Sequence, residues 1–271
     1  MDLDLAGKRA LVTGGSRGIG RGIVEALAAE RATVIFCGRS AEAGAQAEAE
    51  IRATGGDVTF VAADVESDEG IESLCDSLLG SGPIDILVNN VGGAHDAAAG
   101  SRHFADIPRA DWSKTFYKCV FNAVHLCDRM VPGMQERGWG RVINISSTAG
   151  TEPGMSPADY SAAKAALNSA TKALAGSLAQ TGVTANAVAP GPVLTQALRD
   201  YIDFLASDGG WPDGDDAREQ HFITNVMPLK TTRMGRPRDI GAMVAFLASD
   251  MAEFVTGALI RVDGGQASSA A

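Results

Sequence analysis

The sequence predicts an α/β domain in which a parallel sheet of about seven strands is covered by helices on both faces. Short β-branched segments alternate with longer helical segments along almost the whole chain, and this alternation is typical of a doubly wound parallel sheet. The strand segments are continuous hydrophobic runs, as expected when both faces of a sheet are buried. The 271 residues contain no linker and no internal repeat, so we expect a single domain over residues 1–271.

The elements follow one another in a regular order. RALVT, ATVIFC, DVTFVAA and DILVNN are short apolar runs that predict strands, and the longer stretches between them predict the crossover helices that parallel strands require. In the first half we expect strands at residues 9–13, 32–37, 57–63 and 85–90, and helices at residues 18–30, 40–55 and 67–80. In the second half we expect helices at about residues 111–137, 157–180 and 237–248, and strands at residues 141–146, 183–189 and 258–262.

Residues 195–227 interrupt this order. The segment carries seven acidic side chains and includes DGGWPDGDD, whose glycines and proline favour irregular or mobile chain. Tyr201, Phe204, Leu205, Trp211 and Phe222 give it an apolar side. Long irregular insertions in compact domains are usually functional, so we interpret the segment as a variable substrate lid. The alternative is an ordinary solvated surface excursion.

Composition restricts the possible partners. The chain has 33 acidic and 23 basic side chains, a formal net charge of −10, and no cluster of Lys or Arg. Nucleic acids and anionic membrane surfaces attract positive charge, so neither partner is expected. Four cysteines without CxxC spacing and four histidines without HExxH argue against a metal site or a disulfide framework. With no long apolar run and no signal-peptide pattern, we expect a cytoplasmic protein.

A glycine-rich loop follows the first expected strand. It reads TGGSRGIG over residues 13–20 and leads directly into the first expected helix. Glycines permit a sharp turn and a close approach of phosphate oxygens to backbone amides, and the start of a helix adds free N–H donors. The loop therefore predicts a site for the pyrophosphate of a dinucleotide, although a tight packing turn would have the same glycines.

The end of the second expected strand indicates which dinucleotide binds. An acidic residue is usual here when the ribose hydroxyls of NAD are bound, but this chain reads FCGRS over residues 36–40. Arg39, together with Arg17 in the glycine loop, can pair with a 2′-phosphate. We therefore expect NADP(H) rather than NAD(H). A solvated surface arginine is the alternative for Arg39.

A tyrosine and a lysine are candidates for proton transfer. Of the three tyrosines, only Tyr160 is followed by a lysine, Lys164, at the fourth position. On a helix the two side chains share a face, so the ammonium group can lower the tyrosine pKa from about 10. Ser147 directly follows the expected strand at residues 141–146, and its hydroxyl can donate to a carbonyl oxygen that gains negative charge. These side chains predict acid–base chemistry at a ketone or alcohol.

These features resemble the classical short-chain dehydrogenase/reductase family over about residues 5–265. The family's motifs occur in order: the glycine loop, Asp64-Val65, NNVG at residues 89–92, Ser147, YSAAK at residues 160–164 and NAVAPGPV at residues 186–193. The resemblance, which includes 3-oxoacyl-carrier-protein reductase-like members, implies a Rossmann-type fold. It also implies reversible hydride transfer between a nicotinamide and a carbonyl group.

The resemblance assigns roles to individual residues. It implies that Tyr160 transfers the proton, that Ser147 polarises the carbonyl and that Lys164 orients the nicotinamide ribose. It places Thr148, Gly150 and Met155 on the wall of the substrate pocket; His95 is a further candidate there, with a solvated loop histidine as the alternative. The residues expected to contact the cofactor are Gly14, Ser16, Arg17, Gly18, Ile19, Gly20, Arg39, Asp64, Val65, Asn90, Gly92, Tyr160, Lys164, Pro190, Gly191, Val193 and Thr195.

The chain departs from the family's pattern at Cys119. Counting seven residues from Trp112 leads to Cys119, where the resemblance places the asparagine of a catalytic tetrad. We expect the backbone carbonyl to be retained and the hydrogen bonds of the amide side chain to be lost, which predicts a weakened or rerouted proton relay. Cys119 is thus a fourth candidate catalytic residue. The alternative is a buried small thiol, since no histidine four residues away activates it.

The sequence therefore predicts an NADP(H)-dependent oxidoreductase that interconverts a ketone and a secondary alcohol. The apolar side chains of residues 195–227 favour a free, mainly apolar substrate, and the acidic ones disfavour docking of an acidic carrier protein. A 3-oxoacyl thioester reductase and a non-catalytic dinucleotide-binding sensor or structural subunit are the alternatives. The resemblance implies a homotetramer packed through the two long helices, whose alanines permit close approach.

Overall fold

The computed structural model describes residues 3–93, 103–154, 156–207 and 209–268. Its centre is a seven-stranded sheet with the strand order β3-β2-β1-β4-β5-β6-β7. Every neighbouring pair is parallel, which confirms the predicted α/β fold. The strands are β1 (Arg9–Thr13), β2 (Thr33–Gly38), β3 (Val58–Ala62), β4 (Ile86–Asn89), β5 (Gly140–Ile145), β6 (Val183–Pro190) and β7 (Leu259–Val262).

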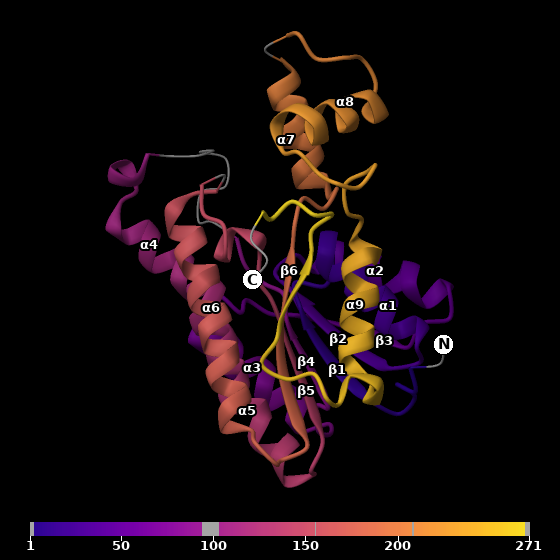
Figure 1. Cartoon of the computed structure of the whole chain (residues 1–271). Helices are drawn as coiled ribbons and strands as arrows, with labels where there is room; N and C mark the ends of the chain where they lie inside the picture. Colours follow the sequence, from indigo (N-terminus) through magenta and orange to yellow (C-terminus); the bar gives the residue numbers. More distant parts are fainter. Residues whose placement is uncertain (1–2, 94–102, 155, 208, 269–271) are drawn as a thin grey trace.

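Helices cover both faces of the sheet (Figure 1). One face carries α1 (Gly18–Ala29), α2 (Ala41–Ala53) and α9 (Pro237–Ala248). The other carries α3 (Asp68–Leu79), α5 (Asn122–Glu136) and α6 (Ala158–Ser177). The neighbouring strands β1 and β4 are followed by helices on opposite faces of the sheet. The carboxyl ends of these two strands therefore border a crevice of the kind in which open α/β sheets bind ligands.

Two glycines allow α1 and α9 to pack closely. A Cβ atom on Gly22 would lie 2.5 Å from the carbonyl carbon of Pro237, and one on Gly241 would lie 2.3 Å from the carbonyl oxygen of Gly22. Side chains larger than hydrogen would separate the helices. This contact fixes α9, and with it the segment that leads into α9, relative to the helix that follows the glycine loop.

The expected helix at residues 111–137 is interrupted. The chain forms α4 (Arg109–Phe116), a π-helical turn at Tyr117–Phe121, and then α5. π-Helical turns inside α-helices are rare and are frequent at functional sites. The interruption contains Cys119, so the residue that departs from the family's pattern also lies where the helix geometry changes.

Residues 195–227 are more regular than we expected. They form α7 (Gln196–Ser207), α8 (Asp215–His221) and a second π-helical turn at Phe222–Val226. The prediction of an irregular segment is wrong for these parts because Leu198, Ile202 and Leu205 recur at helical spacing. They pack in a separate small core with Trp211 and Phe222. Figure 1 shows α7 and α8 projecting beyond the carboxyl end of β6.

Within the described ranges, no helix is long and apolar enough to cross a membrane. Three short 3₁₀ turns complete the secondary structure of those ranges: Phe104–Asp106, Thr148–Gly150 and Asp250–Ala252.

Candidate active site

The glycine loop turns sharply between β1 and α1. Gly14 and Gly18 have φ angles of 67° and 56°, in the left-handed region that glycine adopts without strain. A Cβ atom on Gly20 would lie 2.1 Å from the carbonyl oxygen of Gly14. The residue before α1, Arg17, makes no side-chain capping bond, so the first N–H groups of α1 are available to phosphate oxygens.

The side chain of Asn90 is hydrogen-bonded to the backbone of the glycine loop. Its side-chain nitrogen donates to the carbonyl oxygens of Thr13 at 2.8 Å and Gly14 at 3.2 Å. The hydroxyl of Thr13 in turn accepts from the backbone N–H groups of Asn90 and Val91, at 2.9 and 3.0 Å. The segment after β4 and the glycine loop are therefore one hydrogen-bonded unit, and Asn90 shapes the expected phosphate site from behind.

Arg39 lies at the carboxyl end of β2, as expected, and has an acidic partner that the sequence did not indicate. Its guanidinium lies 3.5 Å from Glu66, and the ammonium group of Lys118 lies 3.5 Å from the same carboxylate oxygen. The Arg39 side chain is 61% exposed, so solvent screens this pair and leaves Arg39 accessible. Of the two expected cofactor contacts that follow β3, Asp64 is exposed whereas Val65 is buried in the core beneath α3.

The structure brings Ser147, Tyr160 and Lys164 together. Ser147 directly precedes the 3₁₀ turn after β5, where its Oγ accepts from the N–H of Ala149 at 3.2 Å. Tyr160 lies in the first turn of α6, and the Nζ of Lys164 lies 5.8 Å from the centre of its ring. Lys164 is buried and donates to the carbonyl oxygen of Ile145 at 2.7 Å. Strand β5 and helix α6 thus present all three groups at the carboxyl edge of the sheet.

Burial controls the acidity of the two titratable groups. It raises the pKa of Tyr160 to about 12, although a hydrogen bond with Ser147 works in the opposite direction. It also lowers the pKa of Lys164, because a buried site disfavours the ammonium charge. The sequence led us to expect that Lys164 would lower the tyrosine pKa. In the chain alone this expectation is wrong: the ammonium group bonds to Ile145, and burial of the phenol dominates.

Cys119 makes the kind of contact that we expected it to lose. Its Sγ accepts from the N–H of Gly93 at 3.3 Å and lies 3.5 Å from the carbonyl oxygen of the same residue, to which it donates. A Cβ atom on neighbouring Gly92 would lie 2.7 Å from the Nζ of Lys164 and 3.7 Å from Sγ of Cys119. The thiol therefore joins the π-helical turn to the segment beside Lys164, and a side chain at Gly92 would displace the Lys164 ammonium group.

The loop at residues 190–195 closes the site on the β6 side. Gly191 donates to the carbonyl oxygen of Val262 at 3.2 Å, and Val193 is buried. Thr195 lies against the glycine loop, since a Cβ atom on Gly18 would meet its methyl carbon at 3.3 Å. Thr195 therefore brings the loop expected to bind the nicotinamide next to the glycine loop expected to bind the pyrophosphate.

Sequence reasoning missed the carboxyl-terminal segment. Gln266 accepts from the hydroxyl of Thr148 at 3.0 Å, and Ser268 donates to Glu152 at 3.2 Å. The chain after β7 thus returns to the loop that follows Ser147. A polar side chain in an otherwise featureless tail was the only available signal. His95 and Met155, which we considered as pocket residues, lie outside the described ranges.

The comparisons agree with this geometry. A family model described as short chain dehydrogenase matches residues 8–204. The chain belongs to this family. It is 37% identical to the D-beta-hydroxybutyrate dehydrogenase of Cupriavidus necator over 262 residues, covering 96% of this chain and 98% of the relative. It is 36% identical to a 3-oxoacyl-[acyl-carrier-protein] reductase of Vibrio cholerae over 267 residues, covering 97% and 98%.

Among solved structures, L-sorbose reductase from Gluconobacter frateurii, complexed with NADPH and L-sorbose, superimposes with a TM-score of 0.90. The identity is 30%, and the alignment covers 99% of this chain and all of that one. The protein is therefore an NAD(P)-dependent oxidoreductase of the short-chain dehydrogenase family that acts on a ketone or alcohol group. In the parts of the chain that the structure describes, no three His, Cys, Asp or Glu side chains are grouped to hold a metal ion.

Proposed function

We propose that the enzyme interconverts a ketone and a secondary alcohol with NADP(H), and that Tyr160 donates or accepts the proton. The observation that carries this proposal is the grouping of Ser147, Tyr160 and Lys164 at the carboxyl edge of β5, beside the uncapped start of α1. In the glycine loop and at Gly92, a Cβ atom would meet neighbouring protein atoms, so these turns require glycine. These residues fit a dinucleotide, whose nicotinamide supplies the hydride when it is bound.

The protein's own groups handle the proton. With a pKa of about 12, Tyr160 is a neutral phenol near pH 7 and is ready to donate to the oxygen of a ketone. Ser147 donates a hydrogen bond to the same oxygen as it gains charge. The ammonium group of Lys164, 5.8 Å from the centre of the Tyr160 ring, partly offsets the cost of burying the tyrosinate that remains. In the alcohol-oxidising direction the same groups act in reverse order.

Arg39 supports the preference for NADP(H) over NAD(H). It is accessible at the end of β2, where an acidic residue would otherwise bind ribose hydroxyls. The L-sorbose reductase and actinorhodin polyketide ketoreductase structures contain NADPH. We expect Arg39→Ala to weaken NADP⁺ binding about tenfold and to leave NAD⁺ binding unchanged, since one charge-assisted contact to the 2′-phosphate is lost. Calorimetric titration of both nucleotides measures this, and equal losses for the two would refute the preference.

We propose a free and mainly apolar ketone as the substrate. Trp211 and Phe222 pack inside the small core of the lid, but Tyr201 and Phe204 on α7 remain 42% and 66% exposed. The exposed acids Asp203 and Asp215 disfavour the approach of an acidic carrier protein. A 3-oxoacyl thioester is the second candidate, supported by the Vibrio cholerae relative and by the acetoacetyl-CoA reductase of Allochromatium vinosum.

The decisive experiment follows the loss of reduced-nicotinamide absorbance with NADPH and with NADH. The substrate panel contains a steroid ketone, an aryl ketone, L-sorbose, acetoacetyl-CoA and a carrier-linked 3-oxoacyl thioester. Turnover of a free ketone with NADPH supports the proposal. Turnover of the carrier-linked thioester alone would overturn the substrate class. Tight NADPH binding without turnover of any member would favour a non-catalytic dinucleotide-binding role.

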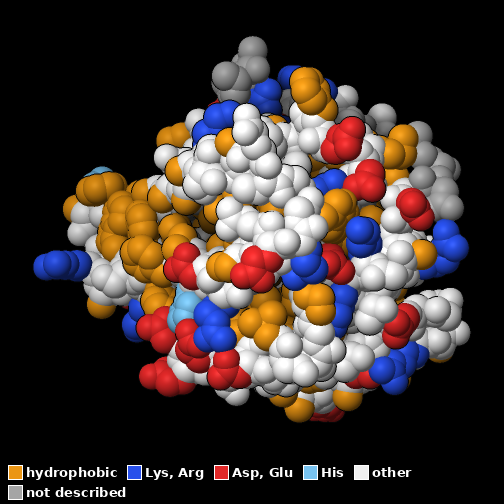
Figure 2. Space-filling model, turned by 90° about the horizontal axis from the view of Figure 1, so that it is seen from below, with side chains coloured by type: hydrophobic (Ala, Val, Ile, Leu, Met, Phe, Trp, Pro, Cys, Tyr) orange, Lys and Arg blue, Asp and Glu red, His pale blue; other side chains and the backbone are white. Residues whose placement is uncertain are grey.

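We also propose a homotetramer that packs through α5 and α6. On or next to α5, Phe121 and Val124 are 54% and 42% exposed. Figure 2 shows hydrophobic side chains gathered at the left of the molecule, the side on which Figure 1 places α4, α5 and α6. Contiguous apolar surface of this kind is typical of an interface. Light scattering tests the proposal: we expect four chains for the native protein and fewer for Phe121→Glu. A monomeric native protein would refute it.

A further inference from the structure

The two roots of the lid lie side by side against the proposed nicotinamide loop. The lid leaves the sheet through Thr195 and returns through residues 228–235, which we call the strap. Leu194 donates to the carbonyl oxygen of Gly235 at 2.8 Å, and Gly235 donates to that of Pro192 at 3.0 Å. A parallel bridge joins Val193 to Gly235. A shift of the loop at residues 190–195 is therefore transmitted directly to the strap.

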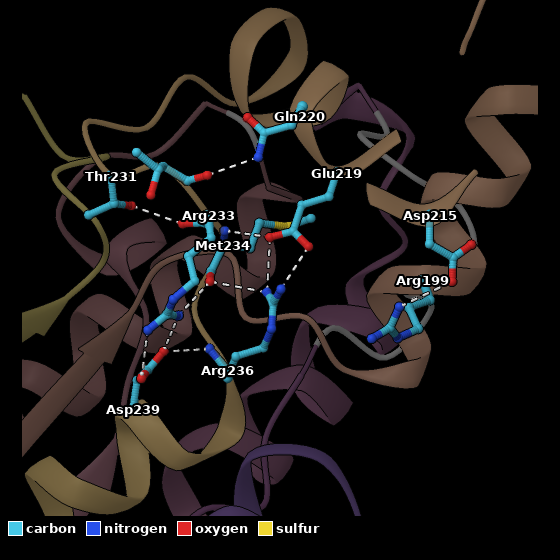
Figure 3. Close-up of polar contacts among 10 residues, drawn as sticks. Arg199, Asp215, Glu219, Gln220, Thr231, Arg233, Met234, Arg236 and Asp239 are labelled. Atoms are coloured by element: carbon cyan, nitrogen blue, oxygen red, sulfur yellow. Dashed lines mark hydrogen bonds and ion pairs between the residues drawn. The ribbon is translucent and has the colours of Figure 1, made fainter. Parts of the chain in front are cut away.

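One buried carboxylate joins α8 to the end of the strap (Figure 3). Glu219 is only 6% exposed. Its Oε1 accepts from the N–H of Met234 at 2.8 Å and from Arg236 at 2.9 Å, and its Oε2 accepts from Arg236 at 2.8 Å. Burial opposes the charge of Glu219, but the guanidinium and the amide outweigh it and hold the carboxyl pKa below its ordinary value.

Arg236 is itself fixed to the body of the protein. It directly precedes α9, and its backbone N–H donates to Asp239 at 2.7 Å. Asp239 also accepts both terminal nitrogens of Arg233, at 2.6 and 3.1 Å, as Figure 3 shows. Since α9 packs against α1 through Gly22 and Gly241, the backbone of Arg236 is fixed to the body of the protein, and its guanidinium attaches α8 to that point.

The other ion pairs of the lid are weaker. Arg218 reaches Asp203 at 2.8 Å, and Arg199 reaches Asp215 at 3.7 Å, but the two acids are 59% and 82% exposed. Exposed pairs contribute little, whereas removal of one partner from a buried pair is strongly unfavourable. In the pair between Glu219 and Arg236 the carboxylate is buried and the arginine side chain is 30% exposed. Among the described contacts, we therefore infer that this ion pair most strongly determines where α8 lies.

We propose that Glu219 and Arg236 are positioning residues that couple the lid to the nicotinamide end of the cofactor site. When a nicotinamide binds to the loop at residues 190–195, the resulting shift of the loop is transmitted through Gly235 to the strap. From the strap it is transmitted through this ion pair to α8. The pair thereby sets how firmly the lid covers a carbonyl substrate. The inference rests on the proposed function, since it requires that the loop bind a nicotinamide.

Hydrogen exchange of the α7 amides tests the coupling without a known substrate. The native protein is compared alone, with NADP⁺ and with 2′-phospho-ADP-ribose, which lacks the nicotinamide. We expect NADP⁺ to slow exchange by about tenfold more than the fragment does. In Glu219→Gln this difference is lost while both nucleotides still bind. Arg236→Met has the same effect, and Arg236→Lys, which retains a charge, restores part of it.

Arg218→Gln is the matched control, because it removes an exposed ion pair from the same helix; it leaves the nicotinamide-dependent difference intact. Equal protection by NADP⁺ and the fragment in the native protein, or unchanged coupling in Glu219→Gln, would overturn the inference. If neither nucleotide binds, the proposed cofactor is wrong and the inference falls with it. Once a ketone is in hand, Glu219→Gln should raise its KM more than it lowers kcat.

Discussion

The carboxyl edge of the sheet and the lid hold their functional groups by different means. At the edge, Ser147 and Lys164 are fixed by backbone: the serine follows a buried strand, and the lysine bonds to the carbonyl oxygen of Ile145. The lid is held by a small apolar core and by the ion pair between the buried carboxylate of Glu219 and the half-buried guanidinium of Arg236. Side-chain contacts of this kind open at lower cost than a sheet does. The comparison leads us to expect a rigid part suited to chemistry, joined to a part whose position responds to ligands.

The largest expected effect is a loss of proton transfer without a change in the lid. Tyr160→Phe removes the proton donor but retains the ring that fills the same space, so we expect kcat to fall about 10³-fold. NADPH should still bind, with at most the loss of one contact from the Tyr160 hydroxyl, and hydrogen exchange of α7 should not change. Steady-state kinetics with the best ketone, together with nucleotide titration, measures this. A kcat within tenfold of the native value would remove Tyr160 from the proposed mechanism.

A second substitution, Phe222→Ala, destabilises the lid without changing the carboxyl edge of the sheet. Phe222 is 1% exposed in the small core, and truncation of a buried phenylalanine costs about 3–5 kcal/mol. We expect Phe222→Ala to speed exchange in α7 and α8 and to raise substrate KM about tenfold, while NADP⁺ affinity changes little. Phe204→Ala, on the exposed face of α7, is the control for exchange. If Phe222→Ala melted the whole sheet cooperatively, the lid would not be an independent part.

These two regions also differ in how far the sequence predicts them. The strands, the glycine loop and the YSAAK pentapeptide are local patterns whose geometry follows from backbone rules, and their positions are confirmed by the fold. The contacts of Glu219 with Arg236 and of Gln266 with Thr148 join residues 17 and 118 positions apart. No periodicity marks them. The lid helices were obscured because glycine and proline beside Trp211 outweighed the helical spacing of Leu198, Ile202 and Leu205.

Cys119 lies at the boundary between local pattern and tertiary contact. Sequence spacing identified the position, but not the two contacts of its Sγ with Gly93. Thiol hydrogen bonds are weak. We expect Cys119→Ala to reduce kcat a few-fold by loosening the segment beside Lys164, and Cys119→Asn to match or exceed native turnover. The pH profile of kcat is the informative measurement. Identical profiles for native protein and both variants would exclude Cys119 from the proton relay.

The smallest expected effect is the pH dependence of stability. Acidic pH affects the contribution of Glu219 in the lid, and alkaline pH affects that of Tyr160 at the carboxyl edge of the sheet. The folded pKa of Glu219 is below its ordinary 4.5, so its contribution to stability is present above about pH 4.5 and is lost as pH falls through the folded value. Tyr160 has a raised pKa, so its contribution is present below pH 10 and is lost as pH rises toward about 12. Acid should therefore loosen the lid first, and alkali the catalytic edge.

Hydrogen exchange of α7 at successive acidic pH values tests this difference. The ratio of rates between the native protein and Glu219→Gln cancels the intrinsic pH dependence of exchange. Above about pH 4.5 the variant should exchange faster, because its neutral amide pairs less strongly with Arg236. The ratio should approach one as the native carboxylate is protonated. A ratio that stays constant down to acid unfolding would mean that the charge of Glu219 does not hold α8, and that the apolar core of the lid alone sets its position.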